Sequence, residues 1–282
     1  MTSDAEPVVL LTGAGSGIGA ATARAFAARG WTVYATDVST PLPERVRERC
    51  RTRELDVTSD EQCRAVADAV RAETGGVDCL VNNAGYAAPG PIEDVDPEVV
   101  RDVFDVVAHG PHRLARAVLP EMRRAGGRIV NVSSVLGRNA YPGMGAYSGA
   151  KAALSSMTDA LRMELADNPA VHVSLVEPAW VETTFAENAR GKLADDRTAD
   201  YDAVYEDLER GWGLDGGPLA MAPERVAARI LDAATEDDPR ARYTVGRPAA
   251  LLRWTERLPA WLSDPAVRWF GRLTTRLARW WR

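Results

Sequence analysis

Short apolar runs alternate with longer stretches of helical periodicity along this 282-residue chain. The apolar runs predict strands at Val8–Thr12, Thr32–Thr36, Glu54–Val57, Cys79–Asn82, Arg128–Val132, His172–Val176 and Tyr243–Val245. Helical patterns fill the gaps at about residues 17–29, 60–73, 97–125, 147–167 and 223–235. Such alternation predicts right-handed crossovers and a parallel sheet covered on both faces. We therefore expect a single α/β domain with a doubly wound seven-stranded parallel sheet, whose ligands lie beyond the carboxyl ends of the strands.

Residues 182–223 break this rhythm, because the segment is long, polar and dotted with glycine. A short helix is expected around Tyr201–Arg210. Long loops in compact domains are usually functional lids or disordered. Since the segment follows a strand whose carboxyl end faces the predicted ligand, we expect it to form a lid that covers the substrate. The lid belongs to a main domain of residues 1–250.

The C-terminal stretch, residues 251–282, is basic and rich in tryptophan. It carries seven Arg against Glu256 and Asp264, and five of the eight Trp of the chain. Pro259 and Pro265 are expected to cut it into at least two helices. Arg recurs every three or four residues between Trp and Leu, as in an amphipathic helix. Such a tail could lie on an anionic membrane, cover an apolar substrate or cap a second subunit.

Composition and charge narrow the class of protein. The net charge of −6 and the 46% hydrophobic content give no reason to expect a nucleic-acid partner. Cys50, Cys63 and Cys79 have no metal-ligand spacing and suit packing in a reducing compartment, so no metal site is predicted. Residues 1–7 carry no basic region before the apolar run Val8–Leu11, which argues against a signal peptide or membrane span and for the cytoplasm.

A glycine-rich turn, Thr12–Gly19, follows the first predicted strand and opens a helix. Glycine lets the backbone approach a phosphate, and the free N–H groups and positive dipole of the helix receive a pyrophosphate. An ordinary turn is the alternative, but the place between strand and helix favours a dinucleotide site. The candidate binding residues are Gly13, Ser16, Gly17, Ile18 and Gly19.

Asp37 ends the second predicted strand, 24 residues after Gly13. A carboxylate there can accept hydrogen bonds from the adenosine ribose hydroxyls. A 2′-phosphate would meet like charge, and no Arg follows in the next two positions. The sequence therefore predicts NAD rather than NADP.

Two further strand ends carry polar groups. Asp56 and Val57 close the third strand, and Asn83, Ala84 and Gly85 follow the fourth. Asp and Asn could simply satisfy their own turns. Their repeated placement on one edge of the sheet favours contact with a shared cofactor.

Tyr147 and Lys151 lie one helical turn apart, so both side chains share a face. An ordinary Tyr loses its proton near pH ~10, and a neighbouring cation favours the phenolate, which suits acid–base chemistry. A plain surface pair is the alternative. Ser134, thirteen residues upstream at the end of a predicted strand, favours a catalytic site.

Together, Thr12–Gly19, Asn82–Gly85, Ser134, Tyr147 and Lys151 resemble the short-chain dehydrogenase/reductase family over about residues 7–246. The resemblance implies a Rossmann-like oxidoreductase in which Tyr147 exchanges a proton with the substrate oxygen and Ser134 stabilises that oxygen. It implies that Lys151 lowers the pKa of Tyr147 and that Tyr147 and Lys151 also contact the nicotinamide ribose. It further implies that the nicotinamide end is wrapped by Pro178, Val181 and Thr183.

Finer detail in Val33–Thr36 and Ala160–Leu165 looks most like members that act on steroids, retinoids and similar lipophilic alcohols. We therefore expect a lipophilic alcohol or ketone as substrate. By the same resemblance, the helices at about 97–125 and 147–167 are expected to form a homodimer or homotetramer.

The chain departs from the family pattern at two places. Ala179 stands where Gly is usual, and Val107 stands where an Asn commonly helps to hold a proton-relay water. Gly110–Pro111 could kink the helix and free a backbone carbonyl for that water, or His109 or His112 could substitute. If none of these acts, the alternative is a catalytically impaired NAD-binding regulatory or interaction protein.

Overall fold

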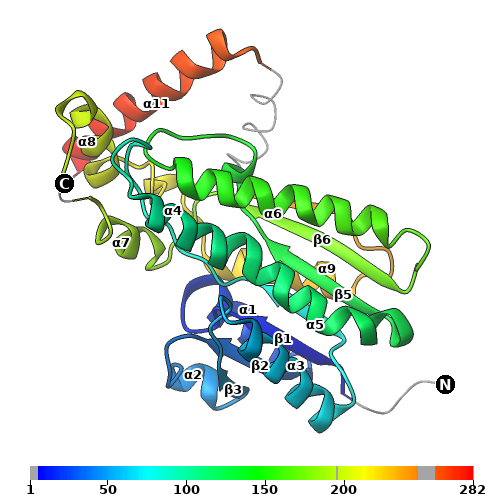
Figure 1. The fold of residues 1–282 in the computed structure, drawn as a ribbon. Helices are drawn as coiled ribbons and strands as arrows, with labels where there is room; N and C mark the ends of the chain where they lie inside the picture. The colour runs from blue at the N-terminus through cyan, green and yellow to red at the C-terminus, as the bar shows by residue number, and fades with distance from the viewer. Residues whose placement is uncertain (1–5, 195, 247–257, 282) are drawn as a thin grey trace.

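The computed structural model describes residues 6–194, 196–246 and 258–281 of the chain (Figure 1). Its centre is a seven-stranded sheet in the order β3-β2-β1-β4-β5-β6-β7, and every neighbouring pair is parallel. The strands are β1 Val8–Thr12, β2 Thr32–Asp37, β3 Arg51–Glu54, β4 Cys79–Asn82, β5 Gly127–Val132, β6 Val171–Pro178 and β7 Arg242–Val245. The predicted doubly wound α/β fold is confirmed.

The third strand is the one that the sequence misplaced. We predicted Glu54–Val57, whereas β3 is Arg51–Glu54. Like β7, it is an edge strand; it pairs with β2 and is largely exposed, so charged residues fit there and hydrophobicity does not mark it. The apolar Leu55 and Val57 follow the strand and are buried in one hydrophobic cluster with Cys63 and Val66.

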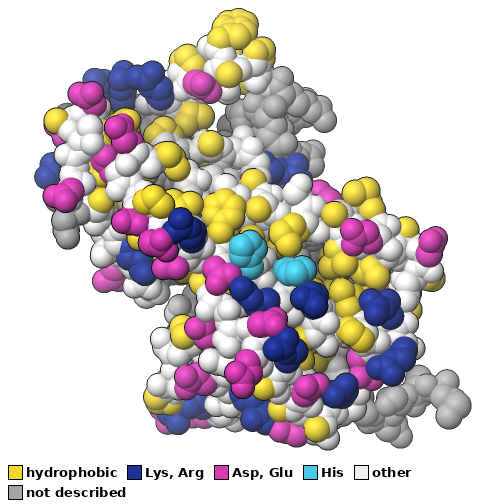
Figure 2. Space-filling view, in the orientation of Figure 1, with side chains coloured by type: hydrophobic (Ala, Val, Ile, Leu, Met, Phe, Trp, Pro, Cys, Tyr) yellow, Lys and Arg dark blue, Asp and Glu magenta, His cyan; other side chains and the backbone are white. Residues whose placement is uncertain are grey.

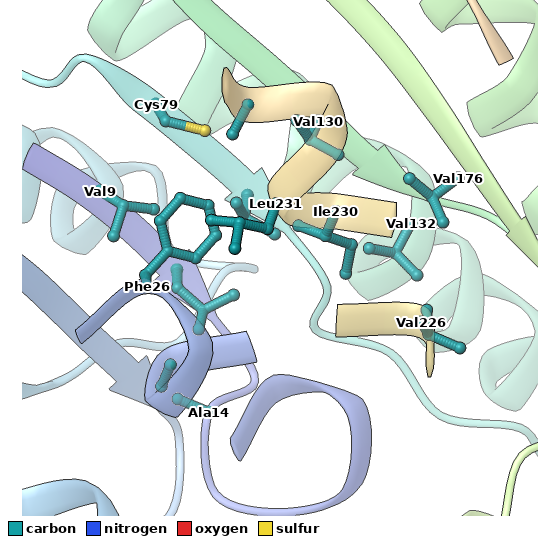
Figure 3. Close-up of a cluster of buried hydrophobic side chains, with 14 of the residues drawn as sticks. Val9, Ala14, Phe26, Cys79, Val130, Val132, Val176, Val226, Ile230 and Leu231 are labelled. Carbon is teal, nitrogen blue, oxygen red and sulfur yellow. The ribbon is translucent and has the colours of Figure 1, made fainter. Parts of the chain in front are cut away.

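Alternating residues of the strands point to opposite faces of the sheet and are buried in two hydrophobic layers. Val9 and Leu11 point to the face covered by α1 (Gly17–Ala27) and α9 (Pro223–Thr235), where Phe26 of α1 lies beside Leu231 of α9 (Figure 3). Val8 and Leu10 point to the face covered by α3 (Asp60–Thr74) and α5 (Gly110–Ala125). The other helices of this part are α2 Glu44–Arg47, α4 Pro97–Phe104 and α6 Gly145–Glu164.

The predicted helix over residues 97–125 is interrupted. A π-helical turn, η1 Asp105–His109, separates α4 from α5, and the Gly110 N–H donates to the Asp105 carbonyl. Pro111 has no N–H to continue the regular pattern. Gly110 also has no room for a side chain, since an added Cβ would lie 2.9 Å from Val57 Cβ. The interruption therefore follows from Gly110–Pro111.

Residues 182–223 fold as a helical segment. Its elements are α7 Phe185–Arg190, η3 Ala199–Tyr201, α8 Asp202–Arg210 and η4 Gly217–Leu219. The predicted helix near Tyr201–Arg210 is confirmed as α8, whereas α7 was not predicted. A bridge between Val181 and Met221 closes the base of the segment.

The C-terminal stretch forms α11, Ala260–Trp281, which packs against α8 at one end of the molecule (Figure 1). The prediction that Pro265 divides it was wrong. The hydrogen bond that Pro265 cannot make falls near the exposed start of the helix, where water can satisfy the carbonyl of Trp261. The part of the stretch before Leu258 lies outside the described residues. Among the described helices, none is long and apolar enough to cross a bilayer.

Candidate active site

One cleft of about 1610 Å³ lies at the carboxyl ends of the strands. Every residue that the sequence predicts for cofactor binding or catalysis lines it. The cleft continues past these residues along α7, the loop that carries Leu214, and α11. The structure therefore brings the predicted residues together and adds a wall that the sequence did not place.

The glycine-rich turn forms a backbone cradle at one end of the cleft. Gly13 has φ +68°, and an added Cβ would lie 2.8 Å from Ala84 Cα. Gly17 has φ +47°, and an added Cβ would lie 2.7 Å from Thr183 Cγ2. Both positions therefore require glycine for backbone conformation and for space. A turn built in this way at the start of α1 fits the phosphates of a dinucleotide.

Thr12 ties this turn to the loop after β4. Its buried hydroxyl accepts hydrogen bonds from the backbone N–H groups of Asn83 and Ala84, each at 3.0 Å. The Asn83 side chain returns hydrogen bonds to the carbonyls of Thr12 and Gly13. Asn83 therefore holds the cradle in shape while it lines the cleft.

Asp37 and Asp56 both satisfy local turns as well as lining the cleft. Asp37 Oδ2 accepts from the Gly15 N–H at 2.9 Å, and Oδ1 accepts from Ser39 N–H at 3.1 Å. Asp56 Oδ1 accepts from the N–H and hydroxyl of Thr58 at 2.9 and 2.7 Å. The hydrogen bond from Gly15 thus holds the Asp37 carboxylate against the glycine-rich turn, at the end of the cleft where an adenosine ribose would lie.

Ser134, Tyr147 and Lys151 meet near the middle of the cleft. Ser134 follows β5 and caps a 3-10 turn, where its hydroxyl accepts from the Leu136 N–H at 3.1 Å. Tyr147 and Lys151 lie on α6, with Lys151 Nζ 5.7 Å from the centre of the Tyr147 ring. Lys151 Nζ donates to the Val132 carbonyl at 2.7 Å. A phenol, a hydroxyl and an amine are thus gathered beside the cradle.

Comparison with known proteins agrees with this arrangement. A family model described as short chain dehydrogenase matches residues 7–194. The chain belongs to the short-chain dehydrogenase family. It is also 33% identical over 251 residues to the uncharacterized oxidoreductase YbbO of Escherichia coli (strain K12), which covers 87% of this chain and 86% of that protein.

Solved short-chain dehydrogenase structures match most of the chain. The family member from Burkholderia phymatum in complex with NAD has a TM-score of 0.75 and 29% identity, covering 90% of this chain and 94% of that one. The member from Burkholderia cenocepacia J2315 in complex with NADP has a TM-score of 0.72 and 26% identity, covering 93% and 96%. The chain is therefore a short-chain dehydrogenase with an oxidoreductase fold whose structural neighbours bind NAD or NADP.

Burial dominates the acid–base properties of this short-chain dehydrogenase site. It raises the pKa of Tyr147, and the hydrogen bond with Ser134 offsets only part of that effect. Burial lowers the pKa of Lys151 to about 7. In the chain by itself, burial thus outweighs the lowering of the Tyr147 pKa that the resemblance implies for Lys151.

Val107, at the place where the family commonly has Asn, is fully buried among Val103 and Ala150. A Cβ added to Gly85 would lie 3.5 Å from Val107 Cγ2 and 3.7 Å from Lys151 Nζ, so both side chains lie beside Gly85. The Val107 side chain offers no hydrogen bond there.

His109 and His112 do not fill this gap. Both side chains are exposed, and neither lines the cleft. His109 Nδ1 lies 3.1 Å from Asp105 Oδ1 instead. The proposed substitution by histidine is therefore wrong.

The backbone of the π-helical turn offers another acceptor. The Gly110 N–H is bonded to the Asp105 carbonyl, and Pro111 has no N–H. Neither residue therefore supplies the usual helical donor to the carbonyl of Val106, a residue that lines the cleft.

Proposed function

We propose that this short-chain dehydrogenase uses NAD to interconvert an alcohol and a ketone or aldehyde on a lipophilic substrate. The observation that carries the proposal is the place of Tyr147. Its hydroxyl is buried and hydrogen-bonded to Ser134. It lies in one cleft that has the glycine cradle on one side and an apolar wall on the other.

In this proposal the cradle of Gly13, Ser16, Gly17, Ile18 and Gly19 holds the pyrophosphate, and Asp37 accepts from the ribose hydroxyls. Asp56, Val57, Asn83, Ala84 and Gly85 line the adenosine half of the site. Pro178, Val181 and Thr183 enclose the nicotinamide end. The bound dinucleotide supplies hydride exchange with the substrate carbon. The NAD preference rests on Asp37, since the basic residues that line the cleft in the described part of the chain, Lys151 and Lys192, lie elsewhere.

The residues of the chain manage the proton. Tyr147 gives a proton to, or takes one from, the substrate oxygen, and Ser134 stabilises negative charge that develops there. Lys151, with a pKa of about 7, can release or accept the proton that Tyr147 needs. Water held by the Val106 carbonyl at the π-helical turn completes the relay, which argues for an active enzyme rather than a catalytically impaired NAD-binding protein.

The preference for a lipophilic substrate rests on what surrounds Tyr147. Its ring packs against Phe185 of α7, with ring centres 5.4 Å apart. The cleft beyond is lined by apolar side chains, among them Leu136, Met144, Phe185, Leu214, Leu219 and Val267. Residues 182–223 act as the lid over this part of the cleft, and steroids, retinoids and similar alcohols are the substrate class we propose.

Two wider features belong to the same proposal. We place the enzyme in the cytoplasm, since Cys50, Cys63 and Cys79 are free thiols. We assign assembly as a homodimer or homotetramer to the surface of α4, α5 and α6.

The test is a turnover screen of alcohols and ketones of graded size and polarity with NAD(H) and NADP(H), beside a fluorescence titration with NADH. We expect NADH binding and turnover of apolar secondary alcohols or ketones. NADH binding without any turnover would support the non-catalytic alternative. A preference for small sugars would overturn the lipophilic assignment.

A further inference from the structure

A buried carboxylate joins the C-terminal helix to the lid. Asp207 of α8 is only 8% exposed. Its Oδ2 accepts from Tyr141 Oη at 2.6 Å, and its Oδ1 accepts from Thr275 Oγ1 of α11 at 2.8 Å. Burial raises the pKa of Asp207 more than these bonds lower it. A carboxylate buried with neutral hydroxyl donors is costly, so it depends on keeping each of them.

The helix is shaped to reach this carboxylate. Gly271 lies inside α11, where glycine costs about 1 kcal/mol relative to alanine. An added Cβ would lie 2.9 Å from Tyr141 Oη and 3.3 Å from Asp207 Oδ2. The glycine lets α11 approach the two groups closely, and this contact offsets its cost.

The same helix lines the substrate part of the cleft. Ser263, Ala266, Val267 and Trp269 of α11 belong to its wall, as does Tyr141. Val267 packs against the hydrophobic cluster that contains Tyr147. The contact at Asp207 therefore fixes a surface that shares one cavity with the proposed reacting hydroxyl.

Trp269 and Trp261 lie on the same helix in different settings. Trp269 is 64% exposed but lines the cleft, so a ligand lying against it would bury apolar surface. Trp261 is 72% exposed at the start of α11 and does not line the cleft. Hydrophobic side chains gather at this free end of the helix (Figure 2).

We propose that α11 is the outer wall of the substrate site, that Asp207 is the positioning residue that fastens it, and that Trp269 selects substrates whose apolar body extends away from the reacting oxygen. The inference rests on the proposed function only for the position of that oxygen at Tyr147. It specifies the substrate class as an elongated apolar carbonyl compound or alcohol.

The test measures calorimetric binding of 2-decanone and 2-butanone to the full-length protein loaded with oxidised NAD, which cannot reduce them, and turnover with NADH is recorded in parallel. We expect the parent to bind 2-decanone at least about tenfold more tightly, since each buried methylene favours binding. Trp269→Ala should remove most of this preference. Trp261→Ala, the matched control, should retain it within about twofold. No preference in the parent, or an equal loss in the two variants, would overturn the assignment.

The anchor is tested with a second matched pair. The hydroxyl oxygens of Thr274 and Thr275 each lie 2.9 Å from the Gly271 carbonyl, but their distances to Asp207 Oδ1 are 3.5 and 2.8 Å, so Thr275 is the better placed to donate its one hydroxyl hydrogen to Asp207. Thr275→Val should speed hydrogen exchange in α11 and reduce the preference for 2-decanone, and Thr274→Val should do so less. If Thr275→Val leaves the preference for 2-decanone unchanged, the contact at Asp207 is merely structural, and the assignment of Asp207 is contradicted.

The two proposals fail separately. If the protein binds the longer ketone more tightly but turns over neither, the oxidoreductase proposal is rejected and the assignment of α11 as the wall of the site stands. If the protein turns over both ketones without any chain-length preference, the oxidoreductase proposal stands and the assignment of α11 as the wall of the site is rejected.

Discussion

The two sides of the cleft are fastened by different kinds of contact. On the cofactor side, the turn after β1 is held by hydrogen bonds that each include a backbone group, with the Ala14 N–H donating to the Thr36 carbonyl at 3.0 Å and the Thr12 hydroxyl accepting from two backbone N–H groups. On the substrate side, the lid is held by side chains. Thr198 and Tyr205 each donate a hydroxyl to Asp94 at 2.7 Å.

Because of this difference, the two sides of the cleft tolerate different kinds of substitution. A backbone cradle tolerates few residue types, because an added Cβ meets main chain or a packed side chain at Gly13 and Gly17. A lid held by side-chain hydrogen bonds over a long sequence separation can change its lining without disturbing the sheet. We therefore expect cofactor binding and substrate choice to respond independently to mutation.

The largest effect is expected where the two sides meet. Tyr147→Phe removes the hydroxyl that we propose exchanges a proton with the substrate, and it should lower kcat by about 10² to 10⁴-fold, with NADH affinity little changed. Tyr86→Phe is the control, since Tyr86 also lines the cleft and its ring faces Lys192 Nζ at 4.3 Å. Steady-state kinetics on the best substrate measures both. Turnover at the parental rate in the Tyr147→Phe variant would end the acid–base assignment.

Lys151 should leave a signature in the pH dependence of stability. Its folded pKa of about 7 lies below the unfolded value of 10.5, so the unfolded chain binds more protons between these values and the cost of burying Lys151 falls as pH rises. The free energy of unfolding of the parent, relative to Lys151→Met, should rise between pH 7 and 10 by a few kcal/mol, at about 1.36 kcal/mol per pKa unit.

Denaturant unfolding at several pH values measures this difference, because other groups cancel between the two proteins. A difference that stays flat across the range would contradict the buried, depressed amine.

The cradle is tested by two glycines with positive φ. Gly17→Ala forces a Cβ toward Thr183 at φ +47°, whereas Gly30→Ala meets nothing within 4 Å at φ +77°. Both should lose about 1–2 kcal/mol of stability from backbone strain. Only Gly17→Ala should weaken NADH binding, by roughly tenfold, or about 1.4 kcal/mol. Equal NADH affinities in a fluorescence titration would remove the cradle from the cofactor site.

Asp37 should decide between the two nicotinamides. Asp37→Ser removes the charge that opposes a 2′-phosphate, so the ratio of kcat/KM for NADPH to that for NADH should rise by roughly tenfold. Asp56→Asn provides the comparison, since its turn can persist with an amide oxygen. A parent that already prefers NADP(H) would show that the role assigned to Asp37 is wrong.

The smallest kinetic effect is expected at Val107. If the Val106 carbonyl holds the relay water, Val107→Asn should change kcat by less than about threefold and lower stability by about 1–3 kcal/mol through burial of an amide. A many-fold increase in kcat would show instead that the native relay is defective.

Much of the candidate site could be predicted because its residues lie at strand ends. Parallel strands share one edge, so Asp37, Asn83, Ser134 and Thr183 were certain to lie near each other once the strands were recognised. The edge strand β3 was harder, since an exposed strand needs no hydrophobic pattern. The electrostatic balance at Tyr147 and Lys151 could not be predicted, because burial sets both pKa values.

The sequence by itself determined the alternation of strands and helices, the glycine cradle and the positions of Ser134, Tyr147 and Lys151, since these depend on local periodicity, φ values and one helical turn. Only the tertiary structure decided that Asp207 joins α8 to α11 and that Trp269 lines the cleft. Thr275 lies 68 residues from Asp207 along the chain, and no periodicity in a sequence encodes a contact between side chains so far apart.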